Sequence, residues 1–302
     1  MDNNNFFSFP RIMMVMKREV MENWKTNLYR LIGLYAAFLF TFLIRMYSMS
    51  SDTMCLSNPD WALDNFSQIS LGIFLFIIGI VSLVYAANIM ENMTTKEKRI
   101  SFLMLPATMI EKFVARFLYV TVGLLIAVLA TVSLAEITRL LLLPLFNVPE
   151  TLHQSVLPKM FFMFKNLIYV SGKDEFIGNA EWGSFNLGLV SICCWAFLIW
   201  YHSLYILGGN FWYKKPFFKT LGTLLLVMIG LSIIMTNIIS WAGVSNMHSF
   251  GQWVGETFNW MTGTIFFAIG IIFFTVFTFF NWWLSYRLFT RSQVIKPKFR
   301  LL

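Results

Sequence analysis

The sequence predicts an all-α polytopic membrane protein with six transmembrane helices. Composition is the first reason: 58% of the 302 residues are hydrophobic and 13% are charged, whereas soluble domains average about 25% charged residues. The second reason is a series of apolar stretches, each long enough to cross about 30 Å of hydrocarbon. The third is that the Lys and Arg residues gather in the segments between these stretches, as they do in multi-pass proteins.

The chain begins with a predicted helix over residues 11–27 that lies along the membrane surface. At about 100° per residue, its apolar and polar side chains separate into two arcs. The apolar arc comprises Ile12, Met13, Met16, Val20 and Trp24, and the polar arc comprises Arg11, Arg18, Glu22 and Lys25. An apolar face with Trp and a basic polar face is typical of a helix in the interface of an anionic lipid leaflet.

Six spans follow within what we expect to be a single transmembrane domain over residues 1–302. Their expected bounds are 28–47, 69–90, 113–135, 187–207, 221–241 and 261–286. Arg30, Arg45 and Arg116 lie close to span ends, where a long side chain can snorkel to the polar interface. No internal repeat or linker divides the chain.

The orientation follows from the positive charges. Eighteen of the 23 Lys and Arg residues lie on the side that holds both termini, and five lie on the other side. The positive-inside rule therefore places both termini in the cytoplasm. The net charge of +8 is spread between spans and does not form one basic soluble face, which excludes a nucleic-acid partner.

The cytoplasmic segment 94–108, between spans two and three, carries two helix-start signals. Thr94-x-x-Glu97 and Thr108-x-x-Glu111 both have the spacing of a capping box, in which the hydroxyl and the carboxylate satisfy two otherwise unpaired backbone N–H groups. We therefore expect a short amphipathic helix near the first signal and another helix after the second.

Pro106 separates these two helices, because a proline disfavours helical geometry at the residue before it. The sequence predicts a helix over residues 95–104, a break at 105–107, and a second helix that runs directly into the third span. A short helix in this place, across the mouth of a membrane bundle, suits contact with a soluble partner.

Two outer loops are expected to carry structure. Residues 146–186 form the longest loop, and we expect a small extracytoplasmic structure there. Residues 242–260 contain aromatic side chains spaced for a re-entrant pair of short helices, and a plain interfacial loop with an aromatic belt fits equally well.

Small and polar residues inside the spans indicate helix contacts. Stripes of small residues let helices approach closely, and they fit either packing within one bundle, a dimer seam or a translocation path. The residues concerned are Gly72, Gly79, Ser82 and Asn88 in the second span and Gly222, Gly230 and Asn237 in the fifth. Asn88 and Asn237 either line a polar path or bond across helices.

The sequence holds few groups for chemistry. It has no G-x-x-x-x-G-K-[ST] phosphate loop, no H-E-x-x-H metal motif and no recognisable nucleophile with its base. We therefore expect no enzymatic activity, no metal and no cofactor in this chain. Glu136 and Arg139, three residues apart, are expected to pair across one helical turn. The lack of acids near the middle of the membrane weakens a secondary-carrier function.

One segment resembles a known family. Residues 102–119, FLMLPATMIEKFVARFLY, are similar to the L-P-[AS]-x-x-x-E-K-F segment of bacterial type-2 ABC transporter permeases. The surface helix, the six spans with both ends inside and the capped helix between spans two and three resemble the layout of the same family. The similarity in layout covers the whole chain, and the residue-level match covers this segment.

The resemblance implies a permease subunit of an ATP-driven exporter in the bacterial cytoplasmic (inner) membrane. A separate cytoplasmic ATPase would bind ATP and Mg²⁺, and a second permease subunit would complete a homo- or heterodimer. Segment 94–108 would be the coupling helix that docks on the ATPase. The docking residues would be Lys96, Glu97, Lys98, Arg99, Phe102, Leu105, Pro106, Thr108, Glu111 and Lys112. A non-transporting scaffold or assembly factor and a secondary carrier are the alternatives.

Overall fold

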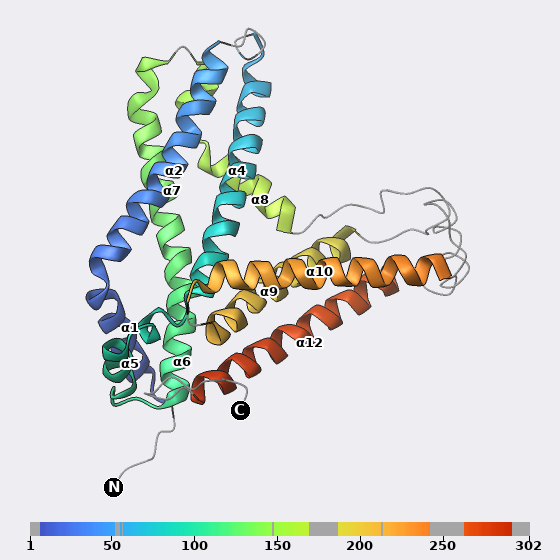
Figure 1. Cartoon of the computed structure of the whole chain (residues 1–302). Helices are drawn as coiled ribbons and strands as arrows, with labels where there is room; N and C mark the ends of the chain where they lie inside the picture. The colour runs from blue at the N-terminus through green and yellow to red at the C-terminus, as the bar shows by residue number, and fades with distance from the viewer. Residues whose placement is uncertain are drawn as a thin grey trace. The chain divides into compact units, whose positions relative to one another are not determined.

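The computed structural model describes residues 7–51, 55, 57–146, 148–168, 187–212, 214–241 and 263–291 (Figure 1). All regular elements in these ranges are helices, and six stretches are long and apolar enough to cross a membrane. These stretches are Trp24–Ser50, Pro59–Met93, Met109–Leu145, Gly188–Phe211, Pro216–Trp241 and Ile265–Thr290. The expectation of an all-helical chain with six apolar spans is confirmed for this part of the chain, and its orientation stays a prediction.

The described residues divide into two compact units, the first up to Lys165 and the second over Asn166–Arg291. The single transmembrane domain over residues 1–302 stays a prediction. The re-entrant segment predicted at 242–260 lies outside the described residues.

Three long helices form the core of the first unit: α2 (Trp24–Ser50), α4 (Pro59–Ala87) and α7 (Leu124–Leu142), which run side by side in Figure 1. Phenylalanine rings fill the space between α2 and α4. Phe42 lies 5.8 Å from Phe66 and 4.9 Å from Phe74 between ring centroids. Offset and tilted ring pairs of this kind pack closely and stabilise the contact beyond simple burial.

The predicted surface helix 11–27 is wrong at both ends. Helix α1 spans Phe9–Glu22, and Trp24 already begins α2. Asn23 separates the two helices with φ −107° and ψ 21°, and its side-chain amide donates to the carbonyl oxygen of Glu19. An asparagine that bonds the backbone in this way competes with the helical hydrogen bonds and favours a break.

The predicted apolar arc of α1 is only partly buried. Ile12, Val15 and Glu19 are buried, whereas Met13 and Val20 are about half exposed. Because α1 packs on α6 (Met109–Leu118), its inner face is chosen by that neighbour and not by the widest apolar arc. The location of α1 in a membrane interface stays a prediction.

Three short elements follow α7. The first lies just before the expected 146–186 loop and the other two lie within it. They are η3 (Leu143–Leu145), η4 (Glu150–His153) and α8 (Leu157–Ile168). Residues 169–186 lie outside the described part of the chain.

The second unit contains α9 (Leu187–Phe211), α10 (Pro216–Trp241) and α12 (Gly263–Thr290). Helices α9 and α12 pack along each other, and Asn281 donates a buried hydrogen bond of 2.8 Å to the Ser203 hydroxyl. Helix α10 starts close to α9 at Gly208, where an added Cβ would lie 2.0 Å from the Thr220 hydroxyl oxygen. Only glycine fits this close approach.

The other glycines of interest lie in open space. An added Cβ at Gly72, Gly79, Gly222 or Gly230 would meet nothing within 4 Å. Among the described residues, these four positions therefore do not serve helix packing, and we call the sides of α4 and α10 that carry them the glycine faces.

Candidate functional site

The segment between spans two and three folds into a short 3₁₀ turn, η1 (Glu91–Met93), and helix α5 (Lys96–Leu103). The predicted Thr94–Glu97 capping box is wrong by one residue. Thr95 is the N-cap, and its hydroxyl accepts the Lys98 N–H at 3.3 Å. Thr94 still has helical dihedrals, and its hydroxyl donates to the Glu91 carbonyl at 2.8 Å, so the preceding 3₁₀ turn keeps it from capping.

The Thr108–Glu111 capping box at the start of α6 is confirmed. The Glu111 N–H donates to the Thr108 hydroxyl at 3.3 Å, and the Thr108 N–H donates to Glu111 Oε2 at 2.8 Å. The chain between α5 and α6 is non-helical around Pro106, as expected. Thr108 and Glu111, which form this cap, are only three residues apart, so the sequence alone is enough to predict the cap.

The Glu111 carboxylate also accepts hydrogen bonds from the beginning of α1, which the sequence does not reveal. Its Oε1 accepts the Ser8 N–H at 2.7 Å and the Arg11 Nε–H at 3.0 Å. Ser8 is the residue that precedes α1, so one buried carboxylate joins the beginning of α1 to the beginning of α6. Glu111 was predicted to contact a partner, but in this structure it is completely buried.

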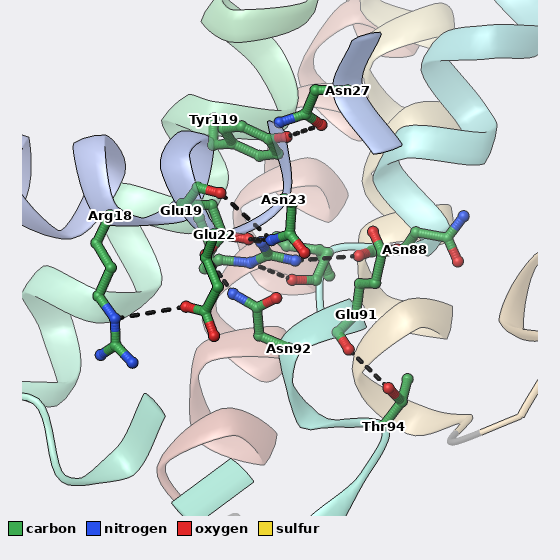
Figure 2. A network of polar contacts seen from close by, with 12 residues as sticks. Arg18, Glu19, Glu22, Asn23, Asn27, Asn88, Glu91, Asn92, Thr94 and Tyr119 are labelled. Carbon is green, nitrogen blue, oxygen red and sulfur yellow. Dashed lines mark hydrogen bonds and ion pairs between the residues drawn. The ribbon is translucent and has the colours of Figure 1, made fainter. Parts of the chain in front are cut away.

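An ion pair with both partners buried joins the same two helices near their other ends. Glu19 of α1 pairs with Arg116 of α6, and Asn92 donates to the same carboxylate. Arg116 also donates to the carbonyl oxygens of Ile89 at 2.7 Å and Asn88 at 3.2 Å. Figure 2 shows Glu19 between Asn23 and Asn92, with the end of the second span close by.

The place of Arg116 near a span end suggested that its side chain snorkels to the polar interface, but in the structure it does not. It is 2% exposed and fully engaged inside the protein. Arg30 instead lies near the surface of the first unit, where it pairs with Glu91 at 2.9 Å. Arg45 donates to the Asn65 side chain at 2.7 Å.

Helix α5 is joined to both neighbours. The Arg18 side chain of α1 donates to the Ser101 hydroxyl, and Lys112 Nζ of α6 donates to the Leu103 carbonyl at 2.7 Å. Arg99 turns inward and donates to the Met93 carbonyl at 3.0 Å. We call α1, α5 and α6 together the helical corner, since polar contacts join every pair of the three.

The predicted docking residues divide into three groups by exposure. Arg99, Phe102, Glu111 and Lys112 are buried. Leu105 and Thr108 are half-buried, and Lys96, Glu97, Lys98 and Pro106 are exposed.

The structure adds two exposed residues that the sequence did not single out. Met104 is 79% exposed and Ile100 is 38% exposed. Lys96, Ile100 and Met104 follow each other at intervals of four and therefore form one row on the outer face of the helix. We call this row, with Glu97 and Pro106 beside it, the α5 tip.

The Glu136–Arg139 pair at the other end of α7 is confirmed, with Nε–Oε2 at 2.7 Å. Arg139 also donates to the carbonyls of Leu152 at 2.9 Å and Gln154 at 2.8 Å, and Glu136 accepts the Val156 N–H at 2.9 Å. All these groups are satisfied by the chain after α7, so this cluster anchors that segment to the helices.

Of the predicted polar residues of the second and fifth spans, Ser82 and Asn237 bond within their own helices, whereas Asn88 bonds to another helix through its backbone carbonyl. Ser82 donates to the Gly79 carbonyl and Asn237 to the Ile233 carbonyl, each within its own helix. Asn88 contributes its carbonyl to Arg116. Met16 and Arg18 are half-buried on α1, whereas Trp24 and Lys25 are exposed at the start of α2.

Metal and ligand sites are not evident in the described ranges. No group of three His, Cys, Asp or Glu side chains could hold a metal ion there. Comparisons with protein-family models, with curated proteins and with solved structures found no match to this chain. The resemblance of residues 102–119 to the type-2 ABC permeases is thus an argument from the sequence alone.

Proposed function

We propose that this chain is the membrane-spanning subunit of an ATP-driven exporter of the type-2 ABC kind. It would work with a separate cytoplasmic ATPase and a second permease subunit, with both termini in the cytoplasm of a bacterium. Support comes from the L-P-A-x-x-x-E-K-F segment at residues 105–113 and from six apolar helices in the described part of the chain.

The observation that carries the proposal is the α5 tip. It presents one basic and two apolar side chains, Lys96, Ile100 and Met104, on a helix whose other face is buried. Apolar side chains exposed on a pre-organised short helix are suited to fill a groove of a protein partner, because little conformational entropy is lost on binding. Because the sequence has no phosphate-binding loop, the partner would be the subunit that hydrolyses ATP.

The test is purification from the native membrane with the α5 tip altered. The unaltered protein should bring an ATPase with Walker motifs, and Met104→Glu or Lys96→Glu should release it while membrane insertion is retained. Met104→Leu and Lys165→Glu are the matched controls, because the first keeps an apolar side chain and the second reverses an exposed charge on α8. Retention of the ATPase by both altered proteins would place the docking surface elsewhere.

The glycine faces of α4 and α10 fit this proposal. Since a Cβ added at Gly72, Gly79, Gly222 or Gly230 would meet nothing within 4 Å among the described residues, these faces suit contact with a second permease subunit or a place along a path. Cross-linking of cysteines introduced at Leu226 or Ile233 on α10, both well exposed, would detect a second copy at this face.

The alternatives predict other outcomes of the same purification. A scaffold or assembly factor would use the same tip but would bring no ATPase. A secondary carrier needs an ionisable group that is free to exchange a proton or ion. The three buried carboxylates among the described residues, Glu19, Glu111 and Glu136, are all in ion pairs, which disfavours such a carrier.

A further inference from the structure

The third span contains a π-helical turn, η2 (Tyr119–Gly123), between α6 and α7. A π turn holds one more residue than the α-helix it interrupts, and its wider hydrogen-bonded rings are less stable, so such turns are rare and concentrate at functional positions. It lies where the helical corner ends and the long helices of the first unit begin.

The helical corner is built as one rigid body. Glu111 of α6 reaches the beginning of α1, and Glu19 of α1 reaches back to Arg116 of α6. These two contacts run in opposite directions between the same two helices, and both carboxylates are buried. Because α1 is held near both ends, it cannot rotate or slide on α6 without breaking a buried ion pair.

The α7 helix, by contrast, is joined to other parts of the first unit. Thr138 of α7 lies 2.9 Å from the Tyr35 hydroxyl of α2, and Arg139 holds the segment after the span. Among the described residues, the corner is bonded to the end of α4, where Arg116 donates to the carbonyls of Asn88 and Ile89, and it continues into α7 through η2. The two bodies therefore meet at the end of α4 and at the π turn.

Among the described residues, the chain passes between the helical corner and the long helices at three places. At each of them the α-helix is interrupted. The first is Asn23, between α1 and α2, and the second is the turn at residues 88–90, between α4 and η1. The third is the π turn itself. Three interruptions at the three crossings give the backbone freedom where a rigid corner needs it in order to tilt.

A small cavity lies beside these crossings. Its volume is about 30 Å³, which is room for about two water molecules. Its polar lining includes Arg30, Asn88, Glu91, Arg116 and Tyr119. Since these side chains are polar, water in the cavity can keep them hydrogen-bonded when the surrounding helices shift slightly.

We propose that the helical corner tilts as one body on these three interruptions, and that the π turn is the element that deforms. A push on the α5 tip would then reach α7 through η2, and it would reach α2 and α4 through Asn23 and the turn at residues 88–90. The hinge is a property of this chain alone and does not depend on an ATPase partner, so it would serve a scaffold as well as an exporter.

Distances between paired spin labels test this proposal on the full chain in lipid nanodiscs, with the three native cysteines Cys55, Cys193 and Cys194 replaced by alanine or serine. One pair, Glu97→Cys with Leu141→Cys, reports on the corner relative to α7. Two reference pairs lie within one body each: Lys17→Cys with Glu97→Cys in the corner, and Leu129→Cys with Leu141→Cys in α7. All these sites are exposed.

The corner–α7 pair should give a broader distance distribution than either reference pair. Deletion of Val122, an exposed residue of the π turn, removes the extra residue and should narrow the distribution to the width within α7. Val122→Ala, which keeps the residue count, should leave it broad. An equally broad distribution within the corner, or an unchanged width after the deletion, would overturn the proposal.

A second variant covers the case in which the deletion prevents folding. Gly123→Ala favours regular helix, and its added Cβ would meet only a Tyr119 ring carbon at 3.8 Å, so it should fold. Because it keeps the residue count, it should narrow the corner–α7 distribution only in part, through the smaller backbone freedom of alanine at position 123, and a distribution as broad as that of Val122→Ala would count against the proposal. In the unaltered protein, amide hydrogens of residues 119–123 should exchange faster than those of the flanking turns, and equal protection would refute the hinge.

Discussion

Glu19 of α1 and Arg116 of α6, 97 residues apart, form an ion pair whose side chains are 5% and 3% exposed. A buried pair of this kind stabilises a fold only while both partners are present, because a single charge left behind is desolvated and unpaired. This relationship decides how the N-terminal helix is held and leads to the first prediction.

Arg116→Met or Glu19→Met alone should each lower the free energy of unfolding by about 3–5 kcal/mol. The double replacement should cost much less than the sum of the two, since no unpaired charge remains. Denaturant unfolding in detergent, followed by tryptophan fluorescence, measures the difference. Additive losses in the double variant would contradict the ion pair.

The caps of α5 provide a comparison between neighbouring threonines. Thr95→Ala should destabilise the helix by about 1 kcal/mol, because the Lys98 N–H loses its acceptor. Thr94→Ala should cost less, since its hydroxyl only donates to the nearby Glu91 carbonyl. Hydrogen exchange of the first turn of α5 distinguishes the two, and the reverse order would restore the Thr94–Glu97 capping box.

Gly208→Ala should disturb the start of α10. The added methyl group would lie 2.0 Å from the Thr220 hydroxyl oxygen and 2.7 Å from its methyl carbon, and overpacking of this kind costs about 1–3 kcal/mol. Thermal unfolding should show the loss, with partial recovery when Thr220→Ala is added. Gly222→Ala and Gly230→Ala, in open space, are the controls and should be tolerated.

Arg139→Leu should release the segment after the third span. Arg139 holds the Leu152 and Gln154 carbonyls, and its loss also leaves Glu136 buried without its counter-ion. Limited proteolysis should then cleave the chain near residues 150–157 much faster. Lys159→Gln, which breaks an exposed pair with Asp64, should change stability by less than about 1 kcal/mol; equal sensitivity of both variants would argue against the anchor.

Patterns within a few residues were predicted well. The Thr108–Glu111 box and the Glu136–Arg139 pair are each three residues apart, so one helical turn brings them together whatever surrounds them. The error at Thr94 arose at the same scale, because the 3₁₀ turn that ends there has no clear sequence signal.

Burial in the helical corner was not predictable in this way. Arg99, Glu111, Lys112 and Arg116 read as surface charges, since charged side chains are seldom fully buried without a partner. A hint was present in Glu19, which shares one helical face with Ile12 and Val15. Its partner, however, lies in another helix.

The sequence by itself determined six apolar helices and the short helix between the second and third, and it predicts the side on which positive charge gathers. Apolar length, capping spacing and composition act locally and need no knowledge of the fold. Only the tertiary structure decided that Glu111 joins Ser8 and that Glu19 joins Arg116, since partners 103 and 97 residues apart meet only after α1 packs on α6. The same packing leaves the α5 tip outside, because the inner face of α5 is already occupied.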